Sequence, residues 1–468
     1  MDNVLQFLDQ DYSGYASMQQ EGMEMLVKAL TAGAGVDAAA FTGGRAMIPE
    51  SLDQTLVNIL HTQDEARLFQ RLKKKPVRSP VHQWNVRDEV GEDDGAWVPE
   101  GGLSIEADQN IFRQFETAKY LQTLRRVTLQ ASISNMLENA MVLEQNAGTL
   151  WLIRNVEKKL FTGDDTLVAE EINGLNRQIP AGNVLDVRGA TANSATFETR
   201  FNEGARMIRE NYGRASLFLS SPMVMQDVQG LIRDRIIFRG GGNVGGGSGI
   251  FDSYPTPFGN IEILDDVFVE ARGIPRPSTL VAQRPGAGAI TASARAPAAN
   301  SEFAGGDAGN YRYRVVFTNR WGDSVASAEE NVAAVVAGDG VTLECTPDGA
   351  GPEPTAIKVY RSIVNAAGGA EVRHAFTVPY TEAFPAAQDV VDLNSFLPGT
   401  IDGYMLTMGA AYDAIEWFQF LPMMKFDLYP TNAAVYPFLM LLFGSLALKK
   451  PVQHARIKNI SPSDLNWF

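Results

Sequence analysis

Residues 136–161 read MLENAMVLEQNAGTLWLIRNVEKKLF, and this stretch decides the fold. Its apolar side chains recur every three or four residues, which is typical of an amphipathic helix. The recurring positions are Met136, Ala140, Leu143, Ala147, Leu150, Ile153, Val156 and Leu160. Asn135 with Glu138 resembles a capping box, and Gly163 predicts the end of the helix. At about 1.5 Å per residue the helix is roughly 39 Å long, the span of a whole domain.

The residues before this helix predict a projecting hairpin and an N-terminal arm. From 75 to 118 the chain is extended, is interrupted by Pro and Gly, and carries clustered acids. It has too few apolar residues for a core of its own, so we expect a long hairpin, with HQWNVRDE outgoing and FRQFETAKYLQTLRRVTL returning. Leucines at helical spacing predict a helix at about 51–73. The small residues that end the segment 1–50 bury little surface, so we expect an arm that needs a partner.

The second half of the chain predicts two further domains. Between 196 and 269 two helices alternate with the strands SLFLSS and NIEILDDVFVE, which indicates helices laid on a sheet. Residues 275–399 are rich in Ala, Gly, Pro, Ser and Thr and contain short alternating strands, which is typical of a β-sandwich. Larger apolar residues return after 400. We therefore expect 190–274 and 400–468 to share a core, with 275–399 inserted between them.

Composition narrows the class of protein. A chain of 468 residues predicts two or three domains, and its formal net charge of -15 argues against a surface devoted to non-specific nucleic-acid binding. The single cysteine, Cys345, excludes an intramolecular disulfide and a cysteine-based zinc site, which fits a cytosolic origin. The first residues carry acids where a secretory signal carries Lys or Arg, so we expect no export. The apolar run Tyr436–Leu448 is shorter than the ~20 residues that cross a bilayer, and a buried strand or strand pair is expected.

No catalytic, cofactor-binding or metal-binding residues are predicted, and we do not expect an enzyme. Gly240–Gly245 matches the GxGxxG spacing, but two prolines and no helix follow, so a surface loop is expected. The histidines lie in four different segments, and no second ligand type stands at metal-binding spacing. These positions are His61, His82, His374 and His454.

A basic run stands out in this acidic chain: Arg71, Lys73, Lys74, Lys75 and Arg78. It fits a solvated helix end, where positive charge is favourable against the helix dipole. It fits equally well a contact with DNA phosphates or with the acidic hairpin of a neighbouring chain. The residues alone leave these alternatives open.

The order of arm, hairpin, long helix and helix-covered sheet resembles the major capsid proteins of tailed bacteriophages, whose fold is named after phage Hong Kong 97. RNVEKKLFTGDDT at the end of the long helix and FGSLALKKPVQHARIKNI near the C-terminus also resemble this family. The insertion resembles an immunoglobulin or fibronectin type III domain, because Tyr311, Tyr313 and Val315 alternate before NRWGDS. The resemblance implies an α+β fold divided into an N-terminal arm at 1–50, a peripheral domain with a spine helix at 51–74 and 119–189, an extended loop at 75–118, an axial domain with closing peripheral strands at 190–274 and 400–468, and the insertion at 275–399.

The resemblance also implies a structural function. Copies of the chain are expected to form hexamers and pentamers of an icosahedral head shell around double-stranded DNA, assembled in the host bacterial cytoplasm and found in the virion. Portal and scaffolding or decoration proteins are expected partners, together with non-specific DNA contact on the inner face, no membrane, and glycan or decoration-protein binding by 275–399. Because aromatic side chains dominate interfaces, the predicted assembly contacts are Trp84, Trp97, Phe112 and Phe115, with Lys73, Lys74, Lys75, Asp93 and Asp94.

Two alternatives remain from the sequence. A tail or decoration protein predicts mostly β structure, which the long helical pattern opposes. A secreted enzyme with a fibronectin-like accessory domain needs a signal peptide and a pair of carboxylates in a cleft.

Overall fold

The computed structural model describes residues 62–91, 97–103, 108–133, 139–233, 253–409, 412–430 and 433–465. All of them belong to one compact unit. The predicted arm at 1–50, the first part of the helix predicted at 51–73 and the GxGxxG segment lie outside these residues.

The long helix is α6 (Ala140–Thr162). It begins at Ala140 rather than at Met136, because the side chain of Asn139 caps it by accepting a hydrogen bond from the backbone N–H of Met141 at 2.9 Å. It ends at Gly163, where a Cβ atom would lie 2.3 Å from the carbonyl oxygen of Ile172. The prediction of the helix and of its end is confirmed, and the predicted start is wrong.

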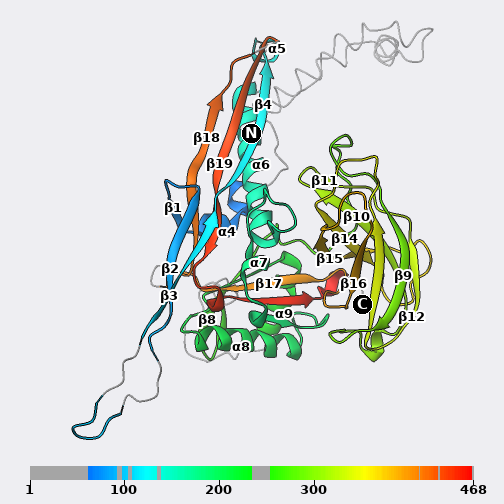
Figure 1. The fold of residues 1–468 in the computed structure, drawn as a ribbon. Coiled ribbons are helices and arrows are strands. Elements are labelled where there is room, and N and C mark those ends of the chain that lie inside the picture. The colour runs from blue at the N-terminus through cyan, green and yellow to red at the C-terminus, as the bar shows by residue number, and fades with distance from the viewer. Residues whose placement is uncertain are drawn as a thin grey trace, which may run out of the picture. The chain divides into compact units, whose positions relative to one another are not determined.

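A four-stranded sheet lies beside α6 (Figure 1). Its strands, in spatial order, are β1 (Lys74–Pro76), β18 (Ile415–Asp427), β19 (Val435–Leu448) and β4 (Lys119–Thr128). Leu152 of α6 packs with Phe438 and Met440 of β19, so one face of the sheet is covered by the helix. The apolar run near 436–448 is thus one long strand.

The helix predicted to reach residue 73 ends earlier. After the short turn η1 (Gln63–Glu65), α4 covers only Arg67–Arg71. Leu72 is extended, and β1 then pairs in parallel with β18, Lys74 opposite Trp417. This pairing with a distant strand overrides the local helical pattern.

The predicted hairpin is formed by β2 (Val81–Glu89) and β3 (Asn110–Thr117), which pair in antiparallel fashion from Val81 opposite Thr117 outward. The N–H of Ala118 donates to the carbonyl oxygen of Pro80 at 2.7 Å and closes the root of the hairpin. Beyond Ala118 the chain enters β4 and joins the four-stranded sheet, followed by α5 (Leu129–Ile133). The returning segment is therefore two strands rather than one.

A mixed six-stranded sheet combines strands from both sides of the insertion. Its spatial order is β5 (Val184–Asp186), β20 (Ala455–Ile460), β17 (Ile401–Leu406), β6 (Leu217–Ser220), β8 (Gly259–Asp265) and β7 (Ser253–Thr256). The helices that accompany it are α7 (Leu175–Gln178), α8 (Ala195–Glu210) and α9 (Pro222–Arg233). Phe201 of α8 meets Phe218 of β6 and Tyr254 of β7 edge to face, so α8 packs directly on the sheet.

Between β8 and β17 the chain forms two sheets with a core of their own. One contains β10 (Gly309–Asn319), β11 (Gly322–Asp323), β12 (Glu330–Val335), β14 (Ala356–Arg361) and β15 (Arg373–Pro379), and the other contains β9 (Ala289–Pro297), β13 (Asp339–Thr346) and β16 (Gln388–Asp392). Val315 and Phe317 of the first sheet share a buried cluster with Val341 and Leu343 of the second. We call residues 289–392 the sandwich; its kinship with immunoglobulin or fibronectin domains stays a prediction.

The class is α+β, as predicted, because the helices cover sheets that are largely antiparallel or mixed. Among the described residues, no helix is long and apolar enough to cross a membrane.

Candidate assembly surfaces

The predicted aromatic contacts lie along the hairpin and its tip, and they differ in how far their side chains are exposed to solvent. Trp97 is 97% exposed, Phe115 66% and Phe112 37%. Trp84 is partly buried and packs with Phe418 of the four-stranded sheet. Three of the four residues are therefore open to solvent in the single subunit, whereas Trp84 supports the hairpin within its own chain.

A buried carboxylate gathers three basic groups at the root of the hairpin. Glu416 is 1% exposed and lies 2.9 Å from Lys449, 3.5 Å from the His82 ring and 3.6 Å from Lys75. Burial, with the charge of Lys75, lowers the pKa of His82, so this ring is neutral at pH 7. Lys75 thus serves a contact within the subunit.

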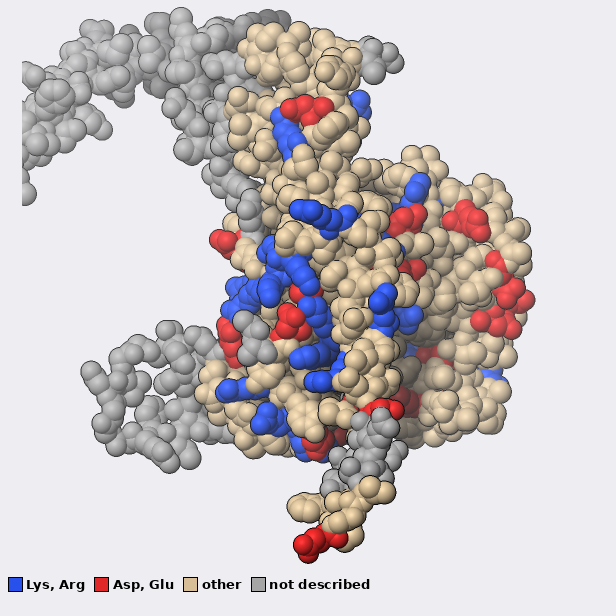
Figure 2. All heavy atoms as spheres, turned by 60° about the vertical axis from the view of Figure 1, so that its left-hand side comes forward, with Lys and Arg blue, Asp and Glu red and all other residues tan. Residues whose placement is uncertain are grey.

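The other two lysines of the basic run differ from each other. Lys74 donates to the carbonyl oxygen of Phe69 at 3.0 Å, near the end of α4, and burial lowers its pKa. This is the helix-end role that the charge pattern allowed. Lys73 stays 66% exposed, 3.8 Å from Asp413. Figure 2 shows Lys and Arg gathered in the middle of this face of the molecule, with acids between them. Asp93 and Asp94 lie outside the described residues.

One surface was not predicted from the sequence, namely the face of the four-stranded sheet opposite α6. Strand alternation places there a set that we call the apolar sheet face: Tyr120, Leu124, Leu421, Met424, Phe426, Leu439, Leu441 and Phe443. Leu124, Leu439 and Phe426 form one row across three strands. Tyr120 and Leu124 are 59% and 56% exposed. Contiguous apolar surface of this kind is typical of a protein interface. The alternation of apolar residues in β4 is a sequence signal for this apolar sheet face, but polar residues also occur on both faces of β4.

A titratable group joins the hairpin to the loop after α6. Glu116, near the end of β3, accepts a hydrogen bond from the side-chain amide of Asn173 at 3.1 Å. Burial raises the pKa of Glu116 to about 7, and the nearby carboxylate of Asp165 adds to this effect. The hairpin root therefore changes charge near neutral pH.

A second carboxyl pair lies in the main core. Glu157 of α6 is fully buried and accepts hydrogen bonds from the backbone N–H groups of Leu68 at 2.7 Å and Phe69 at 3.0 Å. Burial and the adjacent carboxyl group of Asp266 raise the pKa of Glu157 well above its ordinary value. The pair links α6, the first turn of α4 and the loop after β8.

The described residues hold no group of three or more His, Cys, Asp or Glu side chains arranged for a metal ion. Burial lowers the pKa of His374 to about 3 and that of His454 to about 4, so both rings are neutral at pH 7. His454 is fully buried, and His374 is half-buried in β15. His61 lies outside the described residues.

Comparison with known proteins gives a consistent set of relatives. No protein-family model matches the chain. The chain is 25% identical to the major capsid protein of Staphylococcus phage K over 476 residues, which covers 95% of this chain and 96% of that protein. It is 24% identical to the putative major capsid protein of Enterococcus phage phiEF24C over 464 residues, covering 93% and 95%. Its curated relatives are thus phage major capsid proteins, matched along almost their whole length.

Two solved structures show partial similarity to this chain. The encapsulin of the holo-SrpI complex from Synechococcus elongatus PCC 7942 matches with a TM-score of 0.45 and 9% identity, over 90% of this chain and 96% of that one. The capsid structure of the cyanophage P-SCSP1u matches with a TM-score of 0.46 and 7% identity, over 89% and 94%.

Proposed function

We infer that this chain is a phage major capsid protein, a structural protein whose copies assemble into the icosahedral head shell of the virion around the double-stranded DNA genome. The observation that carries this conclusion is the similarity to curated major capsid proteins over 95% of the chain and 96% of theirs. The exposed aromatic hairpin and the apolar sheet face support it, because both need a partner.

We propose the corresponding division of the chain: arm 1–50, peripheral domain 51–74 and 119–189, extended loop 75–118, axial domain with closing peripheral strands 190–274 and 400–468, and immunoglobulin-like insertion 275–399. The shared six-stranded sheet and the separate core of the sandwich support these boundaries.

In the proposed assembly the hairpin of one subunit lies on the apolar sheet face of the next. An isolated two-stranded ribbon is marginally stable in water, so the hairpin gains most from a partner. The sheet offers apolar rows, and Arg126, exposed two residues after Leu124, offers positive charge. Near the hairpin tip Glu89, Glu100 and Asp108 offer the matching negative charge.

The finer partners belong to this proposal. Hexamers and pentamers are the closed rings that such head-to-tail contacts generate. Portal, scaffolding and decoration proteins meet the shell during assembly in the host cytoplasm, and the sandwich is available for a decoration protein or a surface glycan. Exposed Lys73 and Arg78 are the members of the basic run that are free enough to reach DNA phosphates. The 23 residues of α6 argue against the tail or decoration alternative.

The test is assembly. The purified chain is followed by size-exclusion chromatography and negative-stain electron microscopy, alone and co-expressed with its neighbouring phage proteins. Shells, sheets or five- and six-membered rings support the proposal. A persistent monomer under all of these conditions overturns it.

A further inference from the structure

The sandwich is connected to the six-stranded sheet by two chain segments that run side by side. The N–H of Arg272, before the sandwich, donates to the carbonyl oxygen of Thr400 at 3.0 Å, and the N–H of Gly399, after it, donates to that of Arg272 at 3.2 Å. Two adjacent connections define an axis about which a domain can turn, and relative motion is the usual expectation for such a neck.

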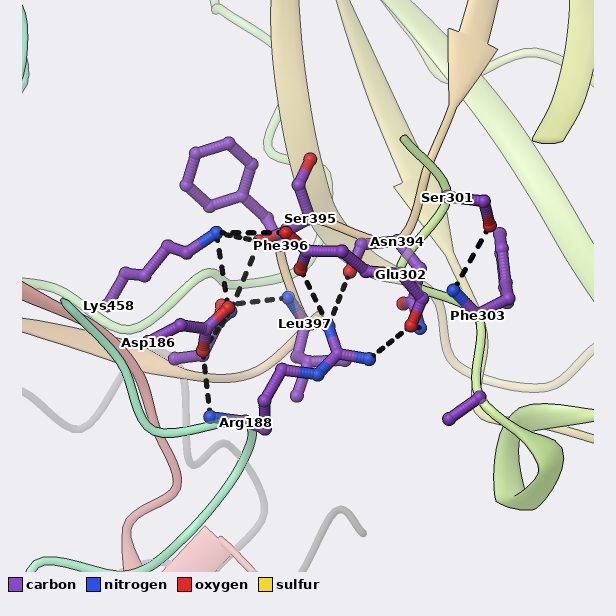
Figure 3. Close-up of polar contacts among 12 residues, drawn as sticks. Asp186, Arg188, Ser301, Glu302, Phe303, Asn394, Ser395, Phe396, Leu397 and Lys458 are labelled. Atoms are coloured by element: carbon purple, nitrogen blue, oxygen red, sulfur yellow. Dashed lines mark hydrogen bonds and ion pairs between the residues drawn. The ribbon is translucent and has the colours of Figure 1, made fainter. Parts of the chain in front are cut away.

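A side chain of the six-stranded sheet region makes further contacts, both with the sandwich and with the segment that follows it (Figure 3). Arg188, which follows β5, donates to the carbonyl oxygens of Asn394 at 2.8 Å and Glu302 at 2.6 Å. Its guanidinium also pairs with the carboxylates of Glu302 at 3.1 Å and Asp307 at 3.4 Å. Glu302 and Asp307 belong to the sandwich, in the loop between β9 and β10, and Asn394 belongs to the segment that leaves it. Arg188 therefore binds both the sandwich and its exit segment.

Side chains of β20 form hydrogen bonds with the segment after the sandwich. Asn459 accepts from the N–H of Leu397 at 2.9 Å and donates to the carbonyl oxygen of Ser395 at 3.1 Å. Lys458 donates to the same Ser395 oxygen at 2.9 Å and pairs with Asp186 at 3.1 Å. The backbone at 395–397 is therefore bonded into the sheet region before β17 begins.

The ring of Phe396 adds further contacts between the segment 395–397 and the sheet region. Three cationic groups face it, Arg272 at 4.9 Å, Lys458 at 5.2 Å and Arg456 at 5.6 Å from its centroid. Asp402 binds both arginines. Burial alone would raise the pKa of Asp402, but the two arginines outweigh it and hold that pKa below its ordinary value. The cations are therefore fixed in place around the ring.

On the sandwich side the network continues into the core. The side-chain oxygen of buried Asn394 accepts from Arg361 at 2.5 Å, and Arg361 binds Asp392. Tyr313, fully buried between the two sheets, donates to the same carboxylate at 3.0 Å. Arg188 and Asn394 both have positive φ, 49° and 59°, a conformation that persists only where the surroundings enforce it.

We propose that Arg188 and residues 394–397 form a clamp that fixes the orientation of the sandwich on the six-stranded sheet. The sandwich is then a rigid part of every subunit instead of a domain tethered by a flexible neck. One consequence rests on the proposed function: the assembled shell presents each sandwich in one defined position.

The test compares Arg188→Gly and Arg188→Lys with the control Arg314→Ala in the full-length chain. Glycine removes the guanidinium without straining a backbone of positive φ, and lysine keeps the charge but not the two-pronged hydrogen bonding. The control removes an arginine that pairs with Glu329 at 3.6 Å within the sandwich, and both of these residues lie outside the two measured segments. Hydrogen exchange is measured in peptides that cover 299–308 and 393–400.

We expect hydrogen exchange in both segments to become at least about tenfold faster in Arg188→Gly than in the natural protein. The rate in Arg188→Lys should lie between those of the natural protein and Arg188→Gly. The rate in the control should equal that of the natural protein. In cryo-electron microscopy of particles of the natural protein, the density of the sandwich should be as well resolved as that of the six-stranded sheet. In Arg188→Gly particles the density of the sandwich should be poorly resolved. Natural exchange rates in Arg188→Gly, or a sandwich already smeared in the natural protein, overturn the clamp. The exchange comparison needs no particles, so a failure of shell formation tests the proposed function separately.

Discussion

At the residue scale, the least expected feature is the carboxyl pair Glu157 and Asp266, buried where α6, α4 and the loop after β8 meet. Burial raises the pKa of both groups, and each is the other's neighbour. A group whose folded pKa is raised stabilises the fold fully below its ordinary pKa, and this contribution is lost as the pH rises through the folded value. The fold should therefore lose stability as the pH rises above the ordinary carboxyl range.

Asp266→Asn tests this pair. The asparagine keeps the oxygen that accepts from the N–H of Phe268 at 2.8 Å and adds an amide that donates to a charged Glu157. We expect the variant to be more stable than the natural chain at pH 8, by about 1–3 kcal/mol, with a smaller difference at pH 5. Thermal unfolding at the two pH values measures it. Equal pH profiles for the two proteins would count against the effect of Asp266 on the pKa of Glu157.

The sequence did not predict this pair because its members belong to segments that only the tertiary fold brings together. The same holds for the predicted lysines. Their spacing left helix-end, DNA and neighbour contacts open, and only the positions of Phe69 and Glu416 show that Lys74 and Lys75 are engaged within the subunit.

At the scale of elements, the hairpin depends on its root, where Glu116 meets Asn173. The pKa of Glu116 is raised to about 7, so its contribution is complete under acidic conditions and is lost as the pH rises through about 7. We expect proteolysis of the hairpin to be faster at pH 8 than at pH 6. In Glu116→Gln, whose amide is neutral throughout, the two rates should be equal. A pH-dependent rate in the variant as large as in the natural chain would refute this role for Glu116.

Periodicity predicted the elements that local sequence specifies. The helix at 136–161 follows from its apolar spacing, although Asn139 and not Asn135 caps it. The end of the helix at 51–73 and the break at Ala118 were not predictable, because each depends on a strand far away in the sequence. β1 leaves the helical pattern to pair with β18, and β4 leaves the hairpin to pair with β19.

At the scale of the whole molecule, assembly should depend on the exposed face of the hairpin and not on the stability of the subunit. Phe115 is 66% exposed, so Phe115→Asp is expected to change the free energy of unfolding by less than about 0.5 kcal/mol. It should nevertheless abolish particle formation, because a charge replaces an apolar anchor.

Val325→Asp is the matched control for this variant. Val325 is 46% exposed on the sandwich, outside the hairpin and the apolar sheet face, and we expect its variant to assemble normally. Particle yield by sedimentation is compared with thermal unfolding for both proteins. Normal yield in Phe115→Asp would exclude this anchor, and a loss in both variants would show that any surface charge is harmful.

The most direct test of the central claim is negative-stain electron microscopy of the purified chain, alone and with its neighbouring phage proteins. We predict closed shells, sheets, or five- and six-membered rings in which every subunit contacts the next through its hairpin. A single monomeric species, unchanged by concentration and by every co-expressed partner, would contradict the conclusion that this chain builds a capsid.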